Sequence, residues 1–208
     1  TRENEMSETN TIKAKDVKQL RDMTGAGMMD CKKALQETSG DLEKAVDFLR
    51  ARGTAKVAKR AEKAANEGAI GSYVHFDGKT AVIIEVNCET DFVANTDDFK
   101  NLAKDLAMHV ASTAPLSVSA EGIDETVIER ERAVYLEQVK EEGKPEHIAE
   151  RIIEGKLQKF FKESALLAQP FVKDPDKTIE QLITEVSSKT GEKIEVARFV
   201  RFKVGEFS

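Results

Sequence analysis

The sequence predicts an α+β fold, and three observations lead to that class. Three short amphipathic segments follow one another between Lys15 and Leu49. Two runs of alternating apolar residues over 70–88 predict a β-hairpin, and a third run over 194–204 can supply another strand. Helical periodicity dominates the stretch between the second and third strands. We therefore expect a helical module, a helical linker, and a small three-stranded antiparallel sheet covered by helices.

Composition narrows the class of protein further. The chain has 208 residues with 38 acidic and 32 basic side chains, a formal charge of −6, which suits one domain or two small ones. The apolar runs are too short to span a bilayer, so we expect a cytoplasmic protein with no membrane segment. Cys31 and Cys88 are too few for a disulfide framework and are expected to be buried thiols. The acidic total, with no Trp and few aromatic residues, argues against bulk binding to phosphate backbones and leaves contacts by local basic stretches open.

The first part of the chain divides into a polar arm and a helical module. Residues 1–11 carry no apolar period and are expected to form a flexible arm, whereas 12–53 are expected to form a three-helix docking module. Gly25-Ala26-Gly27 separates the first helix from the second, and Asp41 is the expected N-cap of the third. The glycines do not follow a strand and lack the Lys-Ser/Thr of a phosphate loop, so they predict a turn.

The stretch over 54–68 is rich in Ala and Lys and is expected to be a helical linker. Its basic residues, Lys56, Lys59, Arg60 and Lys63, recur with helical spacing without a large apolar face. A solvated helix face explains them better than an RNA contact does, because Glu62 and Glu67 dilute the charge.

The remaining residues, 69–208, are expected to form the α+β core. Asp77-Gly78-Lys79 is the turn of the hairpin. Helices are predicted over 97–111, 124–142, 145–168 and 178–188, and Gly143 and Pro145 make 124–168 a helical hairpin. A sheet of three strands leaves an open face or edges, which favours covering by a partner or by a second copy.

The polar turn after the second strand, beginning at Glu89, contains one large apolar side chain. In one interpretation Phe92 packs on the protein's own core while Asp91 or Thr96 caps the next helix. In the other, the hairpin presents Asp91 and Phe92 outward as a binding probe. A metal site at Glu89 and Asp91 is poorly supported, because no further oxygen ligands follow at the spacing of a calcium loop.

Other candidate side chains indicate binding more than catalysis. His75, His109 and His147 are scattered, and none of them completes a nucleophile motif. Met28 and Met29 are adjacent, so a helix cannot bury both on one narrow face, and exposed thioethers suit a protein contact.

Two long motifs carry a resemblance to a known family. LRDMTGAGMMDCKKAL at 20–35 is similar to the N-terminal signature of translation elongation factor Ts, and EVNCETDFVA at 85–94 resembles its core signature. Shorter matches follow in order, and the resemblance covers about 12–205: GKPE at 143–146, IEGKL at 153–157, QPFV at 169–172 and RFVRF at 198–202.

The resemblance implies a guanine-nucleotide exchange factor in translation elongation that binds elongation factor Tu–GDP. Such a protein is not an enzyme and has no cofactor of its own, because the GDP and Mg²⁺ it acts on belong to its partner. It works by binding a state of the partner that holds both poorly. A cytoplasmic location follows, with an organellar origin left open.

The resemblance also assigns roles by position. It implies that the module has a ubiquitin-associated-type fold that docks on the GTPase through Met28, Met29 and Lys32. Arg60 matches a basic linker contact. Asp91 and Phe92 match a pair that intrudes beside the Mg²⁺ site, with Phe92 as a wedge between two helices. His109 matches a further contact near the phosphate-binding region.

Longer members of the family carry two related core halves, whereas this chain has one. Short members resemble dimers in which a second protomer rebuilds the missing half, so we expect a homodimer. It should be non-covalent, because no cysteine lies in the C-terminal strand. Two alternatives remain: a ubiquitin-associated-type adaptor without exchange activity, and a Mg²⁺-dependent hydrolase using Glu89 and Asp91, which lacks a full ligand set and a base.

Overall fold

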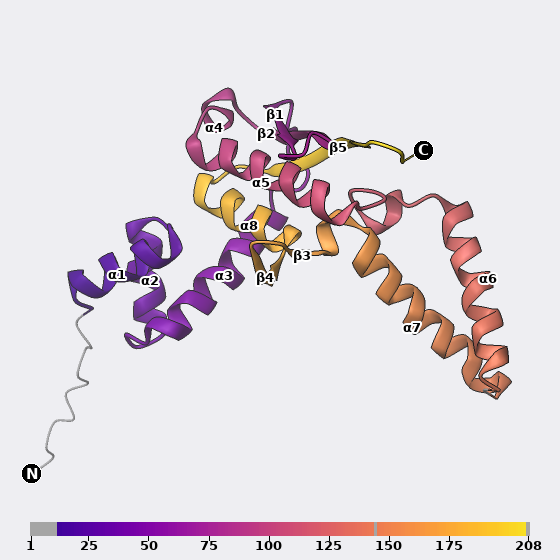
Figure 1. The fold of residues 1–208 in the computed structure, drawn as a ribbon. Coiled ribbons are helices and arrows are strands. Elements are labelled where there is room, and N and C mark those ends of the chain that lie inside the picture. The colour runs from indigo at the N-terminus through magenta and orange to yellow at the C-terminus, as the bar shows by residue number, and fades with distance from the viewer. Residues whose placement is uncertain (1–11, 144, 207–208) are drawn as a thin grey trace, which may run out of the picture. The chain divides into compact units, whose positions relative to one another are not determined.

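The structure, a computed structural model, describes residues 12–143 and 145–206 (Figure 1). The expected arm at 1–11 lies outside the described residues. The described residues form two compact units: one contains residues 12–63 together with Thr184–Lys193, and the other contains residues 64–143, 145–183 and 194–206. The predicted α+β class is confirmed, since helices and a three-stranded antiparallel sheet are both present.

The first unit contains the three predicted N-terminal helices: α1 (Ala14–Thr24), α2 (Met28–Glu37) and α3 (Leu42–Ala58). Gly25 ends α1 in the left-handed conformation, with φ of 67°. Asp41 caps α3 as predicted, because its side chain accepts a backbone hydrogen bond from the first turn at 3.0 Å. One apolar face of each helix enters a common core: Val17, Leu20, Cys31, Ala34, Leu35 and Ala45.

Helix α3 continues past the predicted module boundary at Gly53. The linker expected to be helical over 54–68 is helical only as far as Ala58, and turns follow up to β1. Gly53 is explained by close packing and does not mark the end of a helix. A Cβ atom at Gly53 would lie 2.6 Å from the hydroxyl oxygen of Ser188, so only glycine admits this approach. The boundaries of the domains themselves stay a prediction.

The second unit is built on the predicted sheet of β1 (Glu67–Val74), β2 (Thr80–Cys88) and β5 (Ile194–Lys203), in the order β1-β2-β5. Both pairings are antiparallel. Helix α5 (Asp97–Thr113) covers one face, where alternate residues of β2 and the apolar side of α5 form the core: Val82, Ile84, Val86, Phe99, Leu102 and Leu106. The helix lies so close that a Cβ at Gly71 would be 2.4 Å from a backbone oxygen of α5.

The predicted helical hairpin is also present. Helices α6 (Glu125–Glu141) and α7 (Glu146–Ser164) pack together around a small apolar core of Val139, Ile153 and Leu157. This core is separate from the one under the sheet, so the hairpin depends on its own pairing.

Helix α7 ends four residues earlier than the predicted boundary at Ala168. The backbone N–H of Leu166 donates to the carbonyl of Ser117 at 3.0 Å instead of continuing the helix. A long-range pairing therefore ends α7 where local periodicity predicts more helix. The second unit also contains short elements that the periodicity did not predict: α4 (Asp91–Ala94), η1 (Ala120–Gly122), η2 (Leu166–Ala168), β3 (Pro170–Phe171) and β4 (Asp174–Thr178). The expected helix α8 (Ile179–Thr190) follows, and its residues from Thr184 onward belong to the first unit.

Both cysteines are buried and unpaired with each other, as predicted. None of the described helices combines the length and the apolar character that crossing a bilayer requires.

Candidate functional site

The segment after β2 presents an aromatic side chain to solvent. Asp91 opens the one-turn helix α4, which Thr90 caps by accepting a hydrogen bond from the N–H of Val93 at 3.5 Å. Val93 and Ala94 turn inward and are buried, whereas Phe92 is 83% exposed and Asp91 is exposed beside it. The interpretation in which Phe92 packs on the protein's own core is therefore wrong.

Hydrogen bonds fix this short helix to its surroundings at its C-terminal end. The hydroxyl of Thr96 donates to the carbonyl of Val93 at 2.7 Å and accepts from the N–H of Phe99 at 3.3 Å. Thr96 thereby caps α5, as one interpretation expected, and joins α4 to α5 through one oxygen. The amide of Asn95 donates to the carbonyl of Asp91 at 2.9 Å. Because hydrogen bonds hold α4 at both of its ends, Phe92 loses little further conformational entropy on binding, as a preorganised probe requires.

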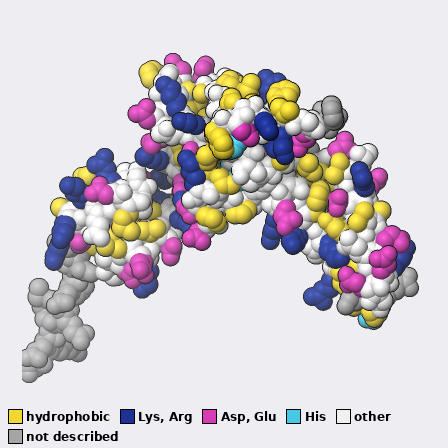
Figure 2. Space-filling model, in the orientation of Figure 1, with side chains coloured by type: hydrophobic (Ala, Val, Ile, Leu, Met, Phe, Trp, Pro, Cys, Tyr) yellow, Lys and Arg dark blue, Asp and Glu magenta, His cyan; other side chains and the backbone are white. Residues whose placement is uncertain are grey.

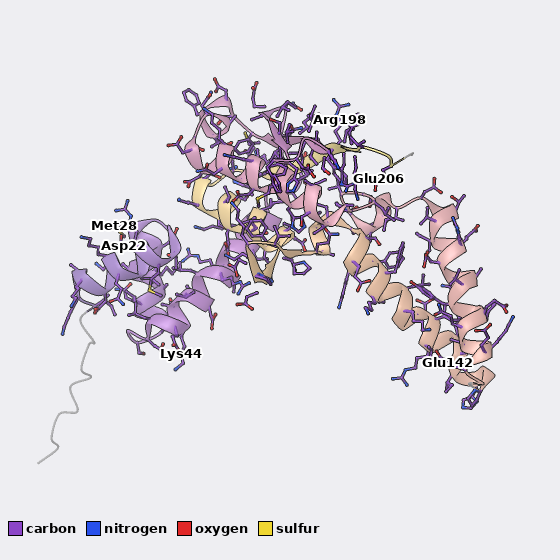
Figure 3. The ribbon with its side chains drawn as sticks, in the orientation of Figure 1. Asp22, Met28, Lys44, Glu142, Arg198 and Glu206 are labelled. Carbon is purple, nitrogen blue, oxygen red and sulfur yellow. The ribbon has the colours of Figure 1, made fainter. Side chains whose placement is uncertain are left out.

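A second exposed apolar group lies in the other unit, around the turn between α1 and α2. Met28 and Met29 begin α2 and are 57% and 77% exposed, and Met28 is labelled in Figure 3. Met23, near the end of α1, is exposed as well, and so is Lys32 one turn into α2. Sequence reasoning missed Met23, although its position one residue before the helix-ending Thr24 is a usable signal.

The basic residues after Gly53 are partly engaged within the first unit. Lys56 forms an ion pair with Asp30 at 2.9 Å, which lowers the pKa of that carboxyl. Arg60 is half-buried in the turns after α3 and lines a cavity of about 400 Å³ together with Lys59. Some of these positive charges are therefore engaged within the first unit, and others lie at its surface.

His109 lies in the interior of the second unit with no exposed surface. Its Nε2 is 2.9 Å from the side-chain oxygen of Gln169, and its Nδ1 accepts the N–H of Val172 at 3.3 Å. Desolvation by burial lowers the pKa of the imidazole. A contact between this ring and a partner would require the surrounding segment to open, and the contact stays a prediction.

Comparisons with known proteins show the family of this chain. The family described as Elongation factor TS matches residues 4–206. Proteins named Elongation factor Ts from Syntrophobacter fumaroxidans and Thermosipho melanesiensis are 56% and 55% identical to this chain, covering 93% and 94% of it and 97% and 100% of their own lengths. The chain belongs to the elongation factor Ts family. The resemblance inferred from 20–35 and 85–94 is confirmed, and an elongation factor of protein biosynthesis is thereby identified.

Within this elongation factor Ts fold, five of the seven residues predicted to bind a partner form two exposed groups, whereas Arg60 is half-buried and His109 is buried. Met28, Met29 and Lys32 belong to the first unit, and Asp91 and Phe92 belong to the second. Each group lies on exposed surface.

Glu89 and Asp91 are the acidic residues that the sequence analysis weighed as metal ligands. Among the residues that the structure describes, no three His, Cys, Asp or Glu side chains gather closely enough to hold a metal ion. Hydrolase chemistry at Glu89 and Asp91 has no support from such a cluster.

Proposed function

We propose that this chain is a guanine-nucleotide exchange factor that binds elongation factor Tu–GDP and promotes GDP release. The observation that carries the proposal is the exposed Phe92 on a short helix fixed by Thr90 and Thr96. An exposed phenyl ring is unfavourable in water and gains about 1.5–3 kcal/mol when a partner buries it. That free energy is available to stabilise a rearranged partner.

The proposed action of the probe is mechanical and electrostatic. Phe92 enters between two helices of the GTPase, and the repacked pair no longer holds Mg²⁺ well. Asp91 enters with Phe92 and places a negative charge near the negatively charged phosphates of GDP, which repels them once Mg²⁺ is held poorly. The chain needs no cofactor and catalyses no bond-making reaction, because the nucleotide and the metal belong to its partner. By reciprocity, GDP weakens the binding of this chain to the same degree.

Docking is proposed to use the first unit. Met28 and Met29 supply flexible apolar contact, and Lys32 supplies a charge on the same helix. We further propose that Arg60 contributes a basic contact and that the protein works in the cytoplasm. Direct nucleic-acid binding is not part of the proposal.

A second copy is proposed to cover the open face of the sheet. The register aligns Ile83 with Val200 and Ala81 with Phe202, on the face opposite α5. Several large apolar side chains on this face are exposed, and Figure 2 shows hydrophobic side chains gathered over the region of the strands: Ile70, Val74, Ile83, Val200 and Phe202. We call these five residues the open sheet face.

Burial of the open sheet face would be favourable, and the same face of a second copy is apolar too. Two sheets pack face to face through their apolar sides, and contiguous exposed apolar area marks an interaction surface. An ion pair between Arg198 and Glu85, 2.8 Å apart, borders the face beside Ile70 and leaves its centre apolar. The dimer is non-covalent, because both cysteines are buried.

The experiment that tests the exchange function is release of fluorescent GDP from purified elongation factor Tu. We expect the chain to accelerate release in a saturable manner, and added GDP to weaken the complex. A chain that binds elongation factor Tu without changing the release rate would be an adaptor, and the proposal would fail.

A further inference from the structure

The sulfur-containing side chains that the structure describes differ widely in their exposure to solvent. The sequence contains five methionines and two cysteines. Met28 and Met29 are exposed at the start of α2, and Met23 is exposed at the end of α1. Met108, on α5, is half-buried. Three thioethers accessible to solvent therefore flank one turn of the first unit.

The thiols are much less accessible than these thioethers. Cys31 belongs to the core of the same unit, and burial raises the pKa of its thiol. Cys88 is buried in the other unit, and its Sγ donates to the carbonyl of Thr90 at 3.1 Å. Because the reactive form of cysteine is the exposed thiolate, neither thiol is a ready target of peroxide.

We propose that Met28 and Met29 form an oxidation-sensitive site, at which peroxide oxidation to the sulfoxide weakens docking of the protein's partner. The docking consequence rests on the proposed function. In the reaction the thioether sulfur loses two electrons and forms a bond to one peroxide oxygen. The O–O bond breaks, and the second oxygen leaves as water.

The chemistry of the product explains the loss of docking. A thioether is apolar and polarisable, and it fills irregular apolar contacts. A sulfoxide carries a strongly polar oxygen, which must find a hydrogen-bond donor when an interface buries it. Two adjacent residues change together, so the apolar contact at the start of α2 becomes polar.

The location of the site keeps the modification from unfolding the protein. The core of the first unit is built from other side chains, with Leu20 and Leu35 fully buried and both methionines outside it. Oxidation therefore changes a surface and leaves the fold intact. Because sulfoxide reductases restore the thioether, the change is reversible.

The test treats the full chain with dilute hydrogen peroxide and locates the added oxygen by peptide mass spectrometry. We expect Met29 and Met28 to be modified before Met108, with an unchanged circular dichroism melting curve. The half-saturating concentration for elongation factor Tu should rise about tenfold, about 1.4 kcal/mol. Treatment with methionine sulfoxide reductases should reverse the rise.

Matched variants assign the effect to the pair. The readout is the ratio of half-saturating concentrations after and before peroxide within each variant. The double variant Met28→Leu with Met29→Leu should give a ratio near one, whereas Met108→Leu should match the unsubstituted chain. The proposal is overturned if the double variant stays sensitive, if the unsubstituted chain binds equally well after oxidation, or if Met108 reacts first.

Failure of the proposed function would look different. In that case the untreated chain would not bind elongation factor Tu at all, which overturns the docking consequence together with the proposed function. The order of oxidation would still be measured by mass spectrometry.

Discussion

The Nε2 atom of His109 lies 2.9 Å from the side-chain oxygen of Gln169, and both residues are buried. Because Val172 donates its N–H to Nδ1, that nitrogen carries no proton, and the ring proton sits on Nε2, directed at Gln169. Gln169 in turn donates to the carbonyl of Glu163 at 2.6 Å, and Thr113 donates to Gln169 at 2.9 Å. The neutral ring thus joins α5 to the segment that follows α7.

This arrangement predicts that stability falls on acidification. The pKa of His109 is lowered in the folded state by desolvation, so between that value and the unfolded value of about 6.5 the unfolded chain binds more protons. The stabilisation is complete above about pH 6.5 and is lost as the pH falls toward the folded pKa. Urea unfolding at a series of pH values measures this, with His109→Gln as the comparison. Parallel pH profiles for the two proteins would contradict the prediction.

Phe92→Ala should slow stimulated GDP release strongly while leaving the fold intact. The loss of about 1.5–3 kcal/mol of burial corresponds to a decrease of about ten- to hundredfold. The melting temperature should stay nearly unchanged, because the ring makes little contact with its own chain. Phe76→Ala is the matched control, since Phe76 is 93% exposed and lies outside α4. Parallel losses of melting temperature and activity in Phe92→Ala would favour a structural role.

Met28→Ala should weaken docking rather than the release step itself. Because Met28 belongs to the first unit and the Asp91–Phe92 probe belongs to the second, we expect a several-fold higher half-saturating concentration and an unchanged rate at saturation. Titration of the release rate against concentration separates these two quantities. Val134→Ala, another exposed apolar truncation, should change neither. A lower rate at saturation in Met28→Ala would place Met28 in the release step.

Thr96→Val should lower the rate at saturation, because it removes both hydrogen bonds that join α4 to α5 and keeps the side-chain shape. We expect a loss of stability of about 1 kcal/mol, typical of a lost N-cap. Thr96→Ser retains the hydroxyl and should restore both stability and rate. If Thr96→Ser is as slow as Thr96→Val, then the hydroxyl does not position the probe.

Phe202→Glu should convert the proposed dimer into a monomer. The substitution places a charge at the open sheet face, where burial against a second copy would leave it unpaired. Light scattering at micromolar concentration measures the mass in solution. Leu116→Glu introduces the same charge at an exposed site outside the sheet and should leave the mass unchanged. A monomeric unsubstituted chain would refute the dimer itself.

Local patterns predicted most of the secondary structure. Alternation over 70–88 identifies the hairpin because side chains of a strand point to opposite faces in turn. Asp41 is recognisable as an N-cap because its hydrogen bond is local: its side chain accepts from the N–H of Lys44, three residues later. Such signals fail where distant segments decide, as after Ser164, where the hydrogen bond from Leu166 to Ser117 ends a helix whose local pattern continues.

The sequence by itself determined the class of fold, the order of its elements and, through two long motifs, the family. Only the tertiary structure decided that the apolar Phe92 faces solvent and that the polar His109 does not. The periodicity of apolar residues indicates the local secondary structure, because it shows which side chains share one face of a helix or a strand. Whether a side chain is buried depends on the segments that fold over it. For His109 one such segment is β3, because the centroids of the His109 and Phe171 rings are 6.1 Å apart.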